Sequence, residues 1–193
     1  MSENIKDFNW LNRSELKIEN NDFYIKATPN SDFFCNPIDG KSSSTAPFLF
    51  KEIKGDFLIN VLVEPEFTNT YDACSVFIYS DENHWIKTAF EYTDLGIKSI
   101  VTVVTDMYSD DANGVEIKEN KAYLQVIRKN DIFACHYSED GVKFKMARLF
   151  KLVVPEIIKV GISAQSPMGL GQFMKFSKLK ITQTIPEDIR KCE

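Results

Sequence analysis

Apolar and polar residues alternate along most of this chain, in short runs that are separated by turn residues. In one run, Phe57, Ile59, Val61 and Val63 occupy every second position, so all four lie on one face of an extended strand. Roughly a dozen such runs follow one another at intervals of about 8–12 residues, which is typical of all-β proteins. The pattern therefore predicts an all-β fold.

Turn residues set the boundaries of the expected strands. Residues 107–114 (MYSDDANG) indicate a loop, and residues 185–193 are the one stretch with helical character. Asp140-Gly141 lies between two alternating runs and predicts a type I′ hairpin, because both central residues of that turn need positive φ. We expect strands at residues 16–20, 22–28, 48–53, 56–65, 73–80, 83–92, 97–106, 115–118, 122–129, 131–138, 142–150, 157–166 and 173–182.

The stretch NHWIKTAFEY, residues 83–92, decides where a candidate site would lie. On a helix, Lys87 and Glu91 would be i,i+4 neighbours. The stretch is, however, rich in aromatic and β-branched residues, is bounded by turn residues and lies between two runs with strand character. We therefore interpret it as a β-strand.

A strand conformation places Trp85, Lys87 and Glu91 on one face, and Ile86 and Phe90 on the other. Lys87 and Glu91 then lie about 13 Å apart and cannot pair directly. Each charge needs a partner from a neighbouring strand or from water, because an unpaired buried charge is costly. We expect this face to be a polar surface or groove that carries an aromatic side chain, and not the core between two sheets.

The composition fits a folded protein with one sizeable core, so we expect residues 1–193 to form a single domain. Hydrophobic residues make up 44% of the chain and charged residues 26%. The net charge of -5 and the scattered basic residues argue against nucleic acid or an anionic membrane as a partner. The sequence lacks a secretory signal and a membrane-spanning run, which predicts a cytoplasmic protein.

The sequence gives little indication of a metal or cofactor. The four cysteines, Cys35, Cys74, Cys135 and Cys192, are far apart and form no C-x-x-C motif, so we expect reduced thiols. There are two histidines, too few for an ordinary zinc site. The acidic residues of SDDANG do not have the spacing of a calcium loop. We expect no metal and no cofactor.

Five segments resemble, in order along the chain, the motifs of one protein family. YDACSVFIYSDENHWIKTAFEY (71–92) is similar to a Y-D-x-A/C stretch followed by a W-I-K-x-x-x-E strand. The others are GDF (55–57), VTVVTDMYSDDANG (101–114), IRKNDIFACHYSEDGVKFKMARLF (127–150) and KVGISAQSPMGLGQFMKF (159–176). They resemble the domain-of-unknown-function family related to the yeast regulation-of-enolase protein, within the concanavalin A-like lectin/glucanase superfamily. The resemblance covers roughly residues 8–182.

This resemblance implies a two-sheet antiparallel β-sandwich of jelly-roll order, with one concave and one convex sheet. In that superfamily sugars commonly bind on the concave face, but the family itself has no settled activity, so the resemblance informs the fold more than the function. The sequence also departs from many relatives. DFFCNPIDGKSSSTAPF (32–48) stands where they have a W-x-x-x-x-H-Y-G-F-like segment, and it lacks that Trp, His and Tyr.

Trp85, Lys87 and Glu91 form the first candidate site. An exposed indole on a sheet face can stack on the apolar face of a sugar ring, and charged neighbours can bond its hydroxyls. Gln165, in GISAQSP, would add an amide to the same surface. The alternative is a solvated sheet face with a structural tryptophan.

Three further residues are candidates at the rim of that surface. Asp72 would cap the edge of the site or pair with Lys87, unless it is an ordinary turn aspartate. Asp110, in the expected loop, would line the groove. Arg148 is either a cation facing the site or a strand charge whose stem packs on aromatic residues.

The leading hypothesis is a non-catalytic module that binds a carbohydrate or related small polar ligand on the concave sheet face. The alternatives are a protein-interaction or regulatory module, as the name of the yeast relative implies, and an uncharacterised glycan hydrolase. The E-x-D-x-x-E motif of retaining glycosidases of the superfamily is absent from the sequence, so we assign no catalytic residue.

Overall fold

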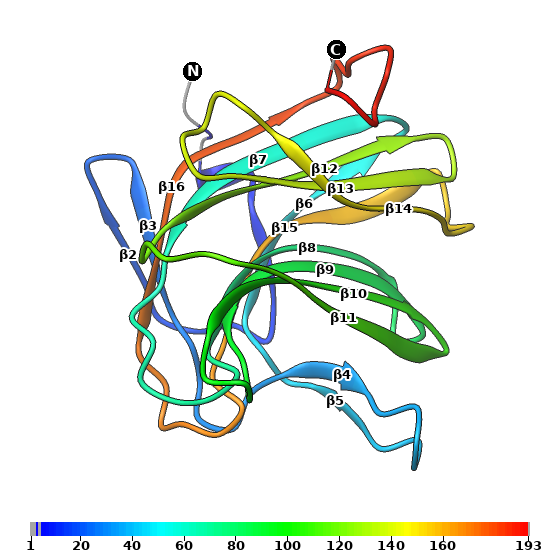
Figure 1. The fold of residues 1–193 in the computed structure, drawn as a ribbon. Helices are drawn as coiled ribbons and strands as arrows, with labels where there is room; N and C mark the ends of the chain where they lie inside the picture. Colours follow the sequence, from blue (N-terminus) through cyan, green and yellow to red (C-terminus); the bar gives the residue numbers. More distant parts are fainter. Residues whose placement is uncertain (1–2, 4, 193) are drawn as a thin grey trace.

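The computed structural model describes residue 3 and residues 5–192, which form two large antiparallel sheets (Figure 1). Sheet A contains, in spatial order, β1 (Asn9–Leu11), β6 (Phe48–Lys54), β15 (Ile157–Gln165), β8 (Ala73–Asp81), β9 (His84–Tyr92), β10 (Lys98–Asp106) and β11 (Tyr108–Glu116). Sheet B contains β14 (Lys145–Lys151), β13 (Ile132–Ser138), β12 (Ala122–Lys129), β7 (Phe57–Glu64), β16 (Phe173–Thr182), β3 (Asp22–Lys26) and β2 (Leu16–Glu19). The all-β sandwich predicted from the sequence is confirmed.

The main hydrophobic core lies between the two sheets. Alternate residues of each strand point inward, as the period of two predicts. Ile86 and Phe90 of β9 contribute from sheet A, while Phe57 and Ile59 of β7 contribute from sheet B, and all four are almost fully buried. The opposite faces of the same strands are thereby turned away from this core, and they are where a site on sheet A must be sought.

A small hairpin covers part of the outer face of sheet A. It consists of β4 (Phe33–Cys35) and β5 (Ser42–Ser44), which pair only with each other. Figure 1 shows β8 to β11 bent into an arch, with this covering hairpin on the hollow side of the arch. A hydrogen bond of 2.9 Å from the Cys35 backbone N–H to the Ser109 side-chain hydroxyl links the hairpin to β11. The hairpin brings Phe33 onto the outer face of sheet A.

The structure corrects the expected loop at residues 107–114. Residues 108–114 belong to β11, which pairs with β10, with Val103 opposite Asp111 and Val104 opposite Asp110. The segment is polar because β11 is the edge strand of sheet A, and charged side chains are characteristic of edge strands. The strand expected at residues 115–118 is not a separate element, because residues 115–116 form the end of β11 and residues 117–118 lie outside it. The other expected strands are observed with small shifts at their ends, and the short β1, β4 and β5 were not foreseen.

Two local predictions are also wrong. Asp140-Gly141 is part of a longer connection between β13 and β14, in which the Asp140 carboxylate accepts hydrogen bonds from the backbone of Val142 and Lys143. Only Gly141 has positive φ there, so the turn is not type I′. Residues 187–192 form bends and turns instead of a helix, while Glu193 lies outside the described residues. A helix this short is unstable alone, and packing of Ile189 sets the local conformation.

Candidate functional site

Strand β9 is extended over His84–Tyr92, as predicted, and it lies between β8 and β10 in the interior of sheet A. Its register places Lys87 between Phe77 of β8 and Val103 of β10. Trp85, Lys87 and Glu91 alternate with the core residues of the strand and therefore share its outer face. The sequence thus placed these three side chains on one surface correctly.

Trp85 does not have the exposed position that the sequence suggested. It is only 3% exposed and packs in a second apolar cluster, with its ring 6.1 Å from that of Phe33 and 5.4 Å from that of Phe77. The covering hairpin brings Phe33 over the indole, and this long-range contact leaves no trace in the strand pattern. Trp85 is therefore a packing residue beneath the hairpin and does not line an open surface.

The Lys87 ammonium is almost completely buried and is held by three acceptors. It donates to the side-chain oxygen of Gln165 at 3.0 Å, to the backbone oxygen of Phe33 at 3.1 Å and to the Asp32 carboxylate at 3.4 Å. An ammonium has three N–H donors, so these contacts use all of them. The predicted proximity of Lys87 and Gln165 is present, and the partner charge of Lys87 is Asp32, which precedes β4.

These residues surround a recess of about 230 Å³ on the outer face of sheet A, which we call the Lys87 recess. Strands β9 and β10 form its base, the segment that leads into the covering hairpin forms one side, and edge strand β11 contributes to another. It is lined by Asp32, Phe34, Tyr71, Lys87, Glu91, Val103, Asp111 and Gln165. The site therefore combines residues from both halves of the chain.

Glu91 is 6% exposed, and no described residue donates a hydrogen bond to its carboxylate. Burial raises the pKa of this carboxyl to about 8; the Lys87 charge acts in the opposite direction, and the other nearby carboxylates raise the pKa further. Those carboxylates are Asp111, Asp32 and Asp94. At neutral pH the Glu91 carboxyl is consequently largely protonated, and it can donate a hydrogen bond as well as accept one.

Asp111 adds a second acidic group that is not neutralised by a salt bridge among the described residues. Although Asp111 is an exposed residue, burial around its carboxyl raises the pKa, with Lys87 lowering it and Asp32 raising it. Three carboxyl groups thus line a recess that holds one ammonium. The excess of acidic groups is the main electrostatic property of the site.

Tyr71 lines the same recess and is anchored by Gln165, whose amide donates 3.2 Å to the Tyr71 backbone oxygen. The Tyr71 backbone has a φ of +68°, a conformation that is strained for a residue with a side chain. Burial raises the pKa of its hydroxyl, and Asp94 and Glu91 add to the effect. Tyr71 and Phe34 supply the aromatic surface that the sequence attributed to Trp85.

Asp72 is fully buried but does not pair with Lys87, so that part of the prediction is wrong. Its carboxylate accepts hydrogen bonds from the backbone of Thr68 and Asn69, from the Ser166 hydroxyl at 2.7 Å and from the Gln172 amide at 2.6 Å. The residue fastens the loop before β8 to the segment after β15. It is the turn aspartate that the sequence offered as the alternative.

Asp110 and Arg148 pair with each other, away from the Lys87 recess. Their side chains form a salt bridge of 2.6 Å, and the Arg148 guanidinium also contacts the backbone oxygens of Thr102 and Asp110. Because β11 and β14 are edge strands of different sheets, this pair links sheet A to sheet B. Alternation along β11 places Asp110 on the opposite side from Asp111, which is why the neighbouring residue lines the recess instead.

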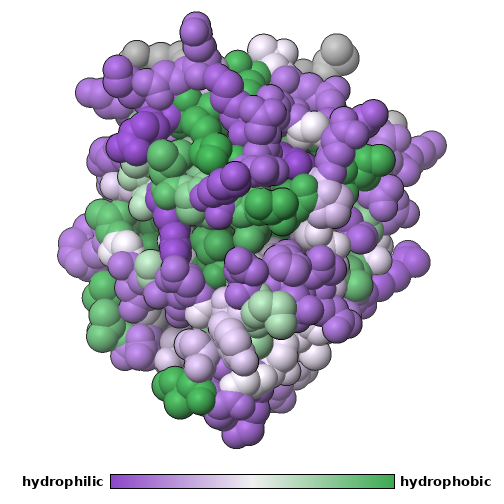
Figure 2. Space-filling model, turned by 90° about the vertical axis from the view of Figure 1, so that its right-hand side faces the viewer, coloured by the Kyte–Doolittle hydropathy of each residue, from purple (hydrophilic) through white to green (hydrophobic). Residues whose placement is uncertain are grey.

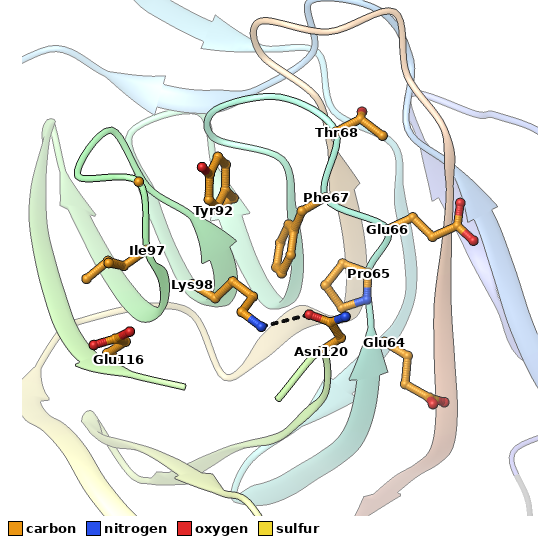
Figure 3. Close-up of a pocket in the computed structure, with 11 residues that line it drawn as sticks. Glu64, Pro65, Glu66, Phe67, Thr68, Tyr92, Ile97, Lys98, Glu116 and Asn120 are labelled. Carbon is orange, nitrogen blue, oxygen red and sulfur yellow. Dashed lines mark hydrogen bonds between the residues drawn. The ribbon is translucent and has the colours of Figure 1, made fainter. Parts of the chain in front are cut away.

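A second hollow, of about 840 Å³, lies at the end of the sandwich and is open to solvent (Figure 3). We call it the Lys98 hollow; its other lining residues include Phe67, Tyr92, Glu116 and Asn120. The Lys98 ammonium donates 2.8 Å to the Asn120 side chain, and Figure 3 shows Glu64 and Glu66 pointing away from it. No charged side chain among its described lining residues is both buried and unpaired. Despite its size, this hollow has fewer features of a ligand site.

The exposed hydrophobic side chains do not form a single broad patch on the face shown in Figure 2, where hydrophilic residues divide them. These side chains come from many parts of the sequence, from Ile18 and Ile38 to Met168 and Leu170. A broad apolar patch is the usual mark of a protein-interaction surface. The visible surface therefore gives less support to the interaction-module alternative than the recess gives to ligand binding.

Other features bear on the remaining predictions. In the part of the chain that the structure describes, no cluster of three His, Cys, Asp or Glu residues is arranged to hold a metal ion. All four cysteines are unpaired in the structure. None of the described residues forms a helix that is long and apolar enough to cross a membrane.

Sequence reasoning missed Asp32, Phe34, Tyr71 and Asp111 as residues of the recess. Asp111 could have been found by counting along β11 had residues 107–114 been interpreted as a strand. Tyr71 directly precedes Asp72, but its positive φ has no signal in a single sequence. Asp32 and Phe34 reach the recess only through the fold of the covering hairpin.

The two packed antiparallel sheets define a two-sheet antiparallel β-sandwich, with the recess on the outer face of one sheet. The chain belongs to the family described as "Protein of unknown function (DUF1349)", which matches residues 10–184. This confirms the family resemblance proposed from the sequence motifs. No curated protein matches the chain by sequence.

Solved structures share this fold. A functionally unknown protein from Saccharomyces cerevisiae has a TM-score of 0.88 at 22% identity, covering 94% of this chain and 99% of that one. The legume lectin-like domain from Entamoeba histolytica has a TM-score of 0.61 at 10% identity, covering 93% and 91%. A mutant of the GH43 protein BlXynB from Bacillus licheniformis has a TM-score of 0.73 at 10% identity, covering 92% of this chain but 37% of that one. Identities this low establish the fold alone.

Proposed function

We propose that this protein is a non-catalytic binding module whose Lys87 recess holds a carbohydrate unit or a similar small polar ligand. The observation that carries the proposal is the buried Glu91 carboxyl, which lines the recess without a hydrogen-bond partner among the described residues. The Glu91 oxygens are not among the fully enclosed unpaired atoms, so a ligand in the recess can reach them and donate a hydrogen bond. A sugar hydroxyl would supply the missing partner.

Size and lining are consistent with this role. A volume of about 230 Å³ is below the roughly 300–1,000 Å³ of sites for drug-sized molecules, so the recess fits one sugar ring at a time, such as one unit of a short oligosaccharide. Tyr71 and Phe34 offer aromatic surface for the apolar face of a ring. The Gln165 amide has a second N–H that can donate to a hydroxyl. Lys87 holds the recess in its shape, because its three N–H donors are already bonded to acceptors of the protein.

The fold relatives support the class of ligand. The structural neighbours include a legume lectin-like domain and GH43 proteins, which makes carbohydrates the ligands to test first. Since identity is 10% in both cases, their binding residues cannot be transferred to this chain. The proposal therefore depends on the chemistry of the recess.

A saccharide array followed by titration calorimetry tests the proposal with two variants on the same strand. Asp111→Asn alters the Lys87 recess, whereas Glu116→Gln alters the Lys98 hollow, and both residues are exposed and belong to β11. We expect a saccharide to bind the wild type, and Asp111→Asn alone to weaken that binding by about tenfold. The absence of any saccharide ligand, or weakening by Glu116→Gln alone, would contradict the proposed site.

A second candidate is hydrolysis of a glycosidic bond in the same recess. Its support is the Glu91 carboxyl, which retains its proton near neutral pH in a recess that a second carboxyl, Asp111, also lines. Glycosidases need one protonated and one ionised carboxyl group. A screen with chromogenic glycosides distinguishes the two candidates: turnover that Glu91→Gln abolishes favours the hydrolase, and saccharide binding without turnover favours the binding module.

A further inference from the structure

Acidic side chains outnumber basic ones in the Lys87 recess. Three acidic side chains line it, Asp32, Glu91 and Asp111, against one basic side chain, Lys87. Lys87 and Asp32 contact each other at 3.4 Å and offset one another. Glu91 and Asp111 then remain without a basic side chain to pair with, and Glu91 becomes negative only when its carboxyl ionises. A neutral ligand would leave both of these carboxyl groups without a basic partner.

Lys87 cannot neutralise the excess by turning toward it. Its ammonium is already bonded to Asp32, to the Phe33 backbone and to Gln165, and the residue is 3% exposed. Turning it toward Glu91 would break these bonds and leave the Asp32 carboxylate and two buried acceptors unpaired, which is costly. The structure therefore fixes the one cation of the recess and leaves Glu91 open to a second cation.

The environment of Glu91 favours a cationic ligand, whatever the number of acidic residues in the recess. Its side chain is more than nine-tenths buried, lines the recess and has no hydrogen-bond donor among residues 3 and 5–192. An ammonium group is a compact donor of three hydrogen bonds, and a charge-assisted bond to a carboxylate is about twice as strong as a neutral one.

We infer that the ligand of the Lys87 recess carries a protonated amine, and that the ligand class is an amino sugar whose ammonium lies between Glu91 and Asp111. This inference rests on the proposed function and specifies the chemistry of the same site. The ring of the sugar contacts Tyr71 and Phe34, while its ammonium donates hydrogen bonds to the Glu91 and Asp111 carboxylates. A simple amine lacks the ring and forms fewer contacts.

Binding of an ammonium should also release a proton from the Glu91 carboxyl. The free recess holds Glu91 largely protonated, because burial raises its pKa to about 8. An ammonium beside the carboxyl favours the ionised form, so Glu91 loses its proton to solvent as the amino sugar binds. The net reaction exchanges one proton for one protonated amine. The groups that face Glu91 and affect this exchange are Lys87, Asp111, Asp32, Asp94 and Tyr71.

The test compares two probes that differ in charge and share the same sugar ring. Titration calorimetry at about pH 6.5 and low salt measures binding of glucosamine trisaccharide and of its N-acetylated counterpart, with ethanolamine as the ringless amine. We expect the glucosamine trisaccharide to bind at least tenfold more tightly than either of the other two. Added salt should reduce this preference, because screening weakens the attraction between charges.

Two variants connect that preference with the acidic groups. Asp111→Asn at the exposed edge strand should reduce the preference for glucosamine trisaccharide about tenfold without affecting the fold. Glu91→Gln, which keeps the shape of the side chain, should abolish proton release on binding, measured as the dependence of the heat on the buffer. Glu116→Gln, on the same strand as Asp111, should change neither quantity.

The outcomes separate this inference from the proposed function. Equal or tighter binding of the N-acetylated trisaccharide, with sensitivity to Asp111→Asn, would overturn the amino-sugar assignment and retain the saccharide site. Binding of ethanolamine as tightly as the trisaccharide would overturn the sugar component. Failure of every saccharide to bind would remove the proposed function, and this inference with it.

Discussion

The Lys87 ammonium donates a 3.0 Å hydrogen bond to the Gln165 side chain, across the strand that separates β9 from β15. The two residues are 78 positions apart in the sequence. On β8 between them, the outward positions nearest Gln165 are the small residues Ala73 and Ser75, which leave room for the lysine stem. This contact joins the covering hairpin, the centre of sheet A and the Tyr71 loop into one site.

Lys87→Met should reduce the free energy of unfolding by about 2 kcal/mol. The substitution leaves the Asp32 carboxylate and two buried acceptors without their donor, and the loss stays below the roughly 3–5 kcal/mol of a fully buried pair because the Asp32 side chain is 24% exposed. Urea unfolding measures it. Lys41→Met, which removes an exposed pair with Asp39, is the control and should change stability by less than about 0.5 kcal/mol.

The double variant Lys87→Met/Asp32→Asn tests whether the unpaired Asp32 carboxylate causes part of this loss. Removing the uncompensated carboxylate should restore part of the lost stability, so the double variant should be more stable than Lys87→Met alone. Additive losses from the two substitutions would mean that the Lys87–Asp32 contact contributes nothing to the fold.

Glu91 should make the protein less stable as the pH rises. Its pKa is raised from 4.5 to about 8 in the folded protein, so its contribution is fully present below pH 4.5 and is lost as the pH rises through about 8. The loss is on the order of 5 kcal/mol, since the shift is about 3.5 pKa units and one unit corresponds to about 1.4 kcal/mol. Asp111 acts in the same direction. Unfolding measured in urea from about pH 5 to pH 9 should show this decline.

Glu91→Gln should flatten that pH dependence and increase stability at the alkaline end, because the amide cannot ionise. The control is Glu82→Gln in the exposed turn between β8 and β9, which should retain the wild-type slope. Identical pH profiles for wild type and Glu91→Gln would show that Glu91 is not responsible.

Much of this arrangement follows from the sequence alone. The period of two in residues 83–92 was enough to place Lys87 and Glu91 on one face, and the same reasoning on residues 157–166 brought Gln165 to the same surface. Local alternation specifies which side of a strand a residue occupies. The family motifs added the two-sheet sandwich, which the alternation does not determine.

The remaining errors share a physical cause, which is contact between distant segments. Whether Trp85 is exposed depends on Phe33, 52 positions earlier in the sequence, and nothing local to the tryptophan reports that contact. Likewise, Asp110 was selected and Asp111 was not, because the polar run of residues 107–114 gave no indication that it pairs with β10. Tertiary pairing overrode the local preference for a turn.

Tyr71 should matter for binding and Trp85 for folding. Tyr71→Gly relieves the strain of the +68° φ but adds chain flexibility, so stability should remain within about 1 kcal/mol of wild type while saccharide affinity falls about tenfold.

Trp85→Phe should lower stability by about 1–2 kcal/mol with affinity unchanged. Urea unfolding and titration calorimetry provide the two readouts. The reverse pattern would restore Trp85 as the stacking residue.

Arg148→Ala should weaken the connection between the edges of the two sheets and leave ligand binding intact. The residue bonds Asp110 and two backbone oxygens across β11 and β14, and Asp110 is mostly exposed, so we expect a loss of about 1 kcal/mol. Hydrogen exchange should increase in β11 and β14 before it increases in central strands. Lys145→Ala, which breaks an exposed pair with Glu139, should change neither quantity measurably.

Asp72→Asn should affect both stability and binding, although Asp72 does not line the recess. The buried carboxylate accepts hydrogen bonds from Thr68, Asn69, Ser166 and Gln172, and an amide nitrogen would place a donor where these donors point. We expect a loss of about 2–3 kcal/mol in urea unfolding. Because Asp72 follows Tyr71 directly, the loosened loop should also weaken saccharide binding. Asp39→Asn, in an exposed turn of the covering hairpin, should cost less than about 1 kcal/mol, and an equal loss in both variants would argue against a special role for Asp72.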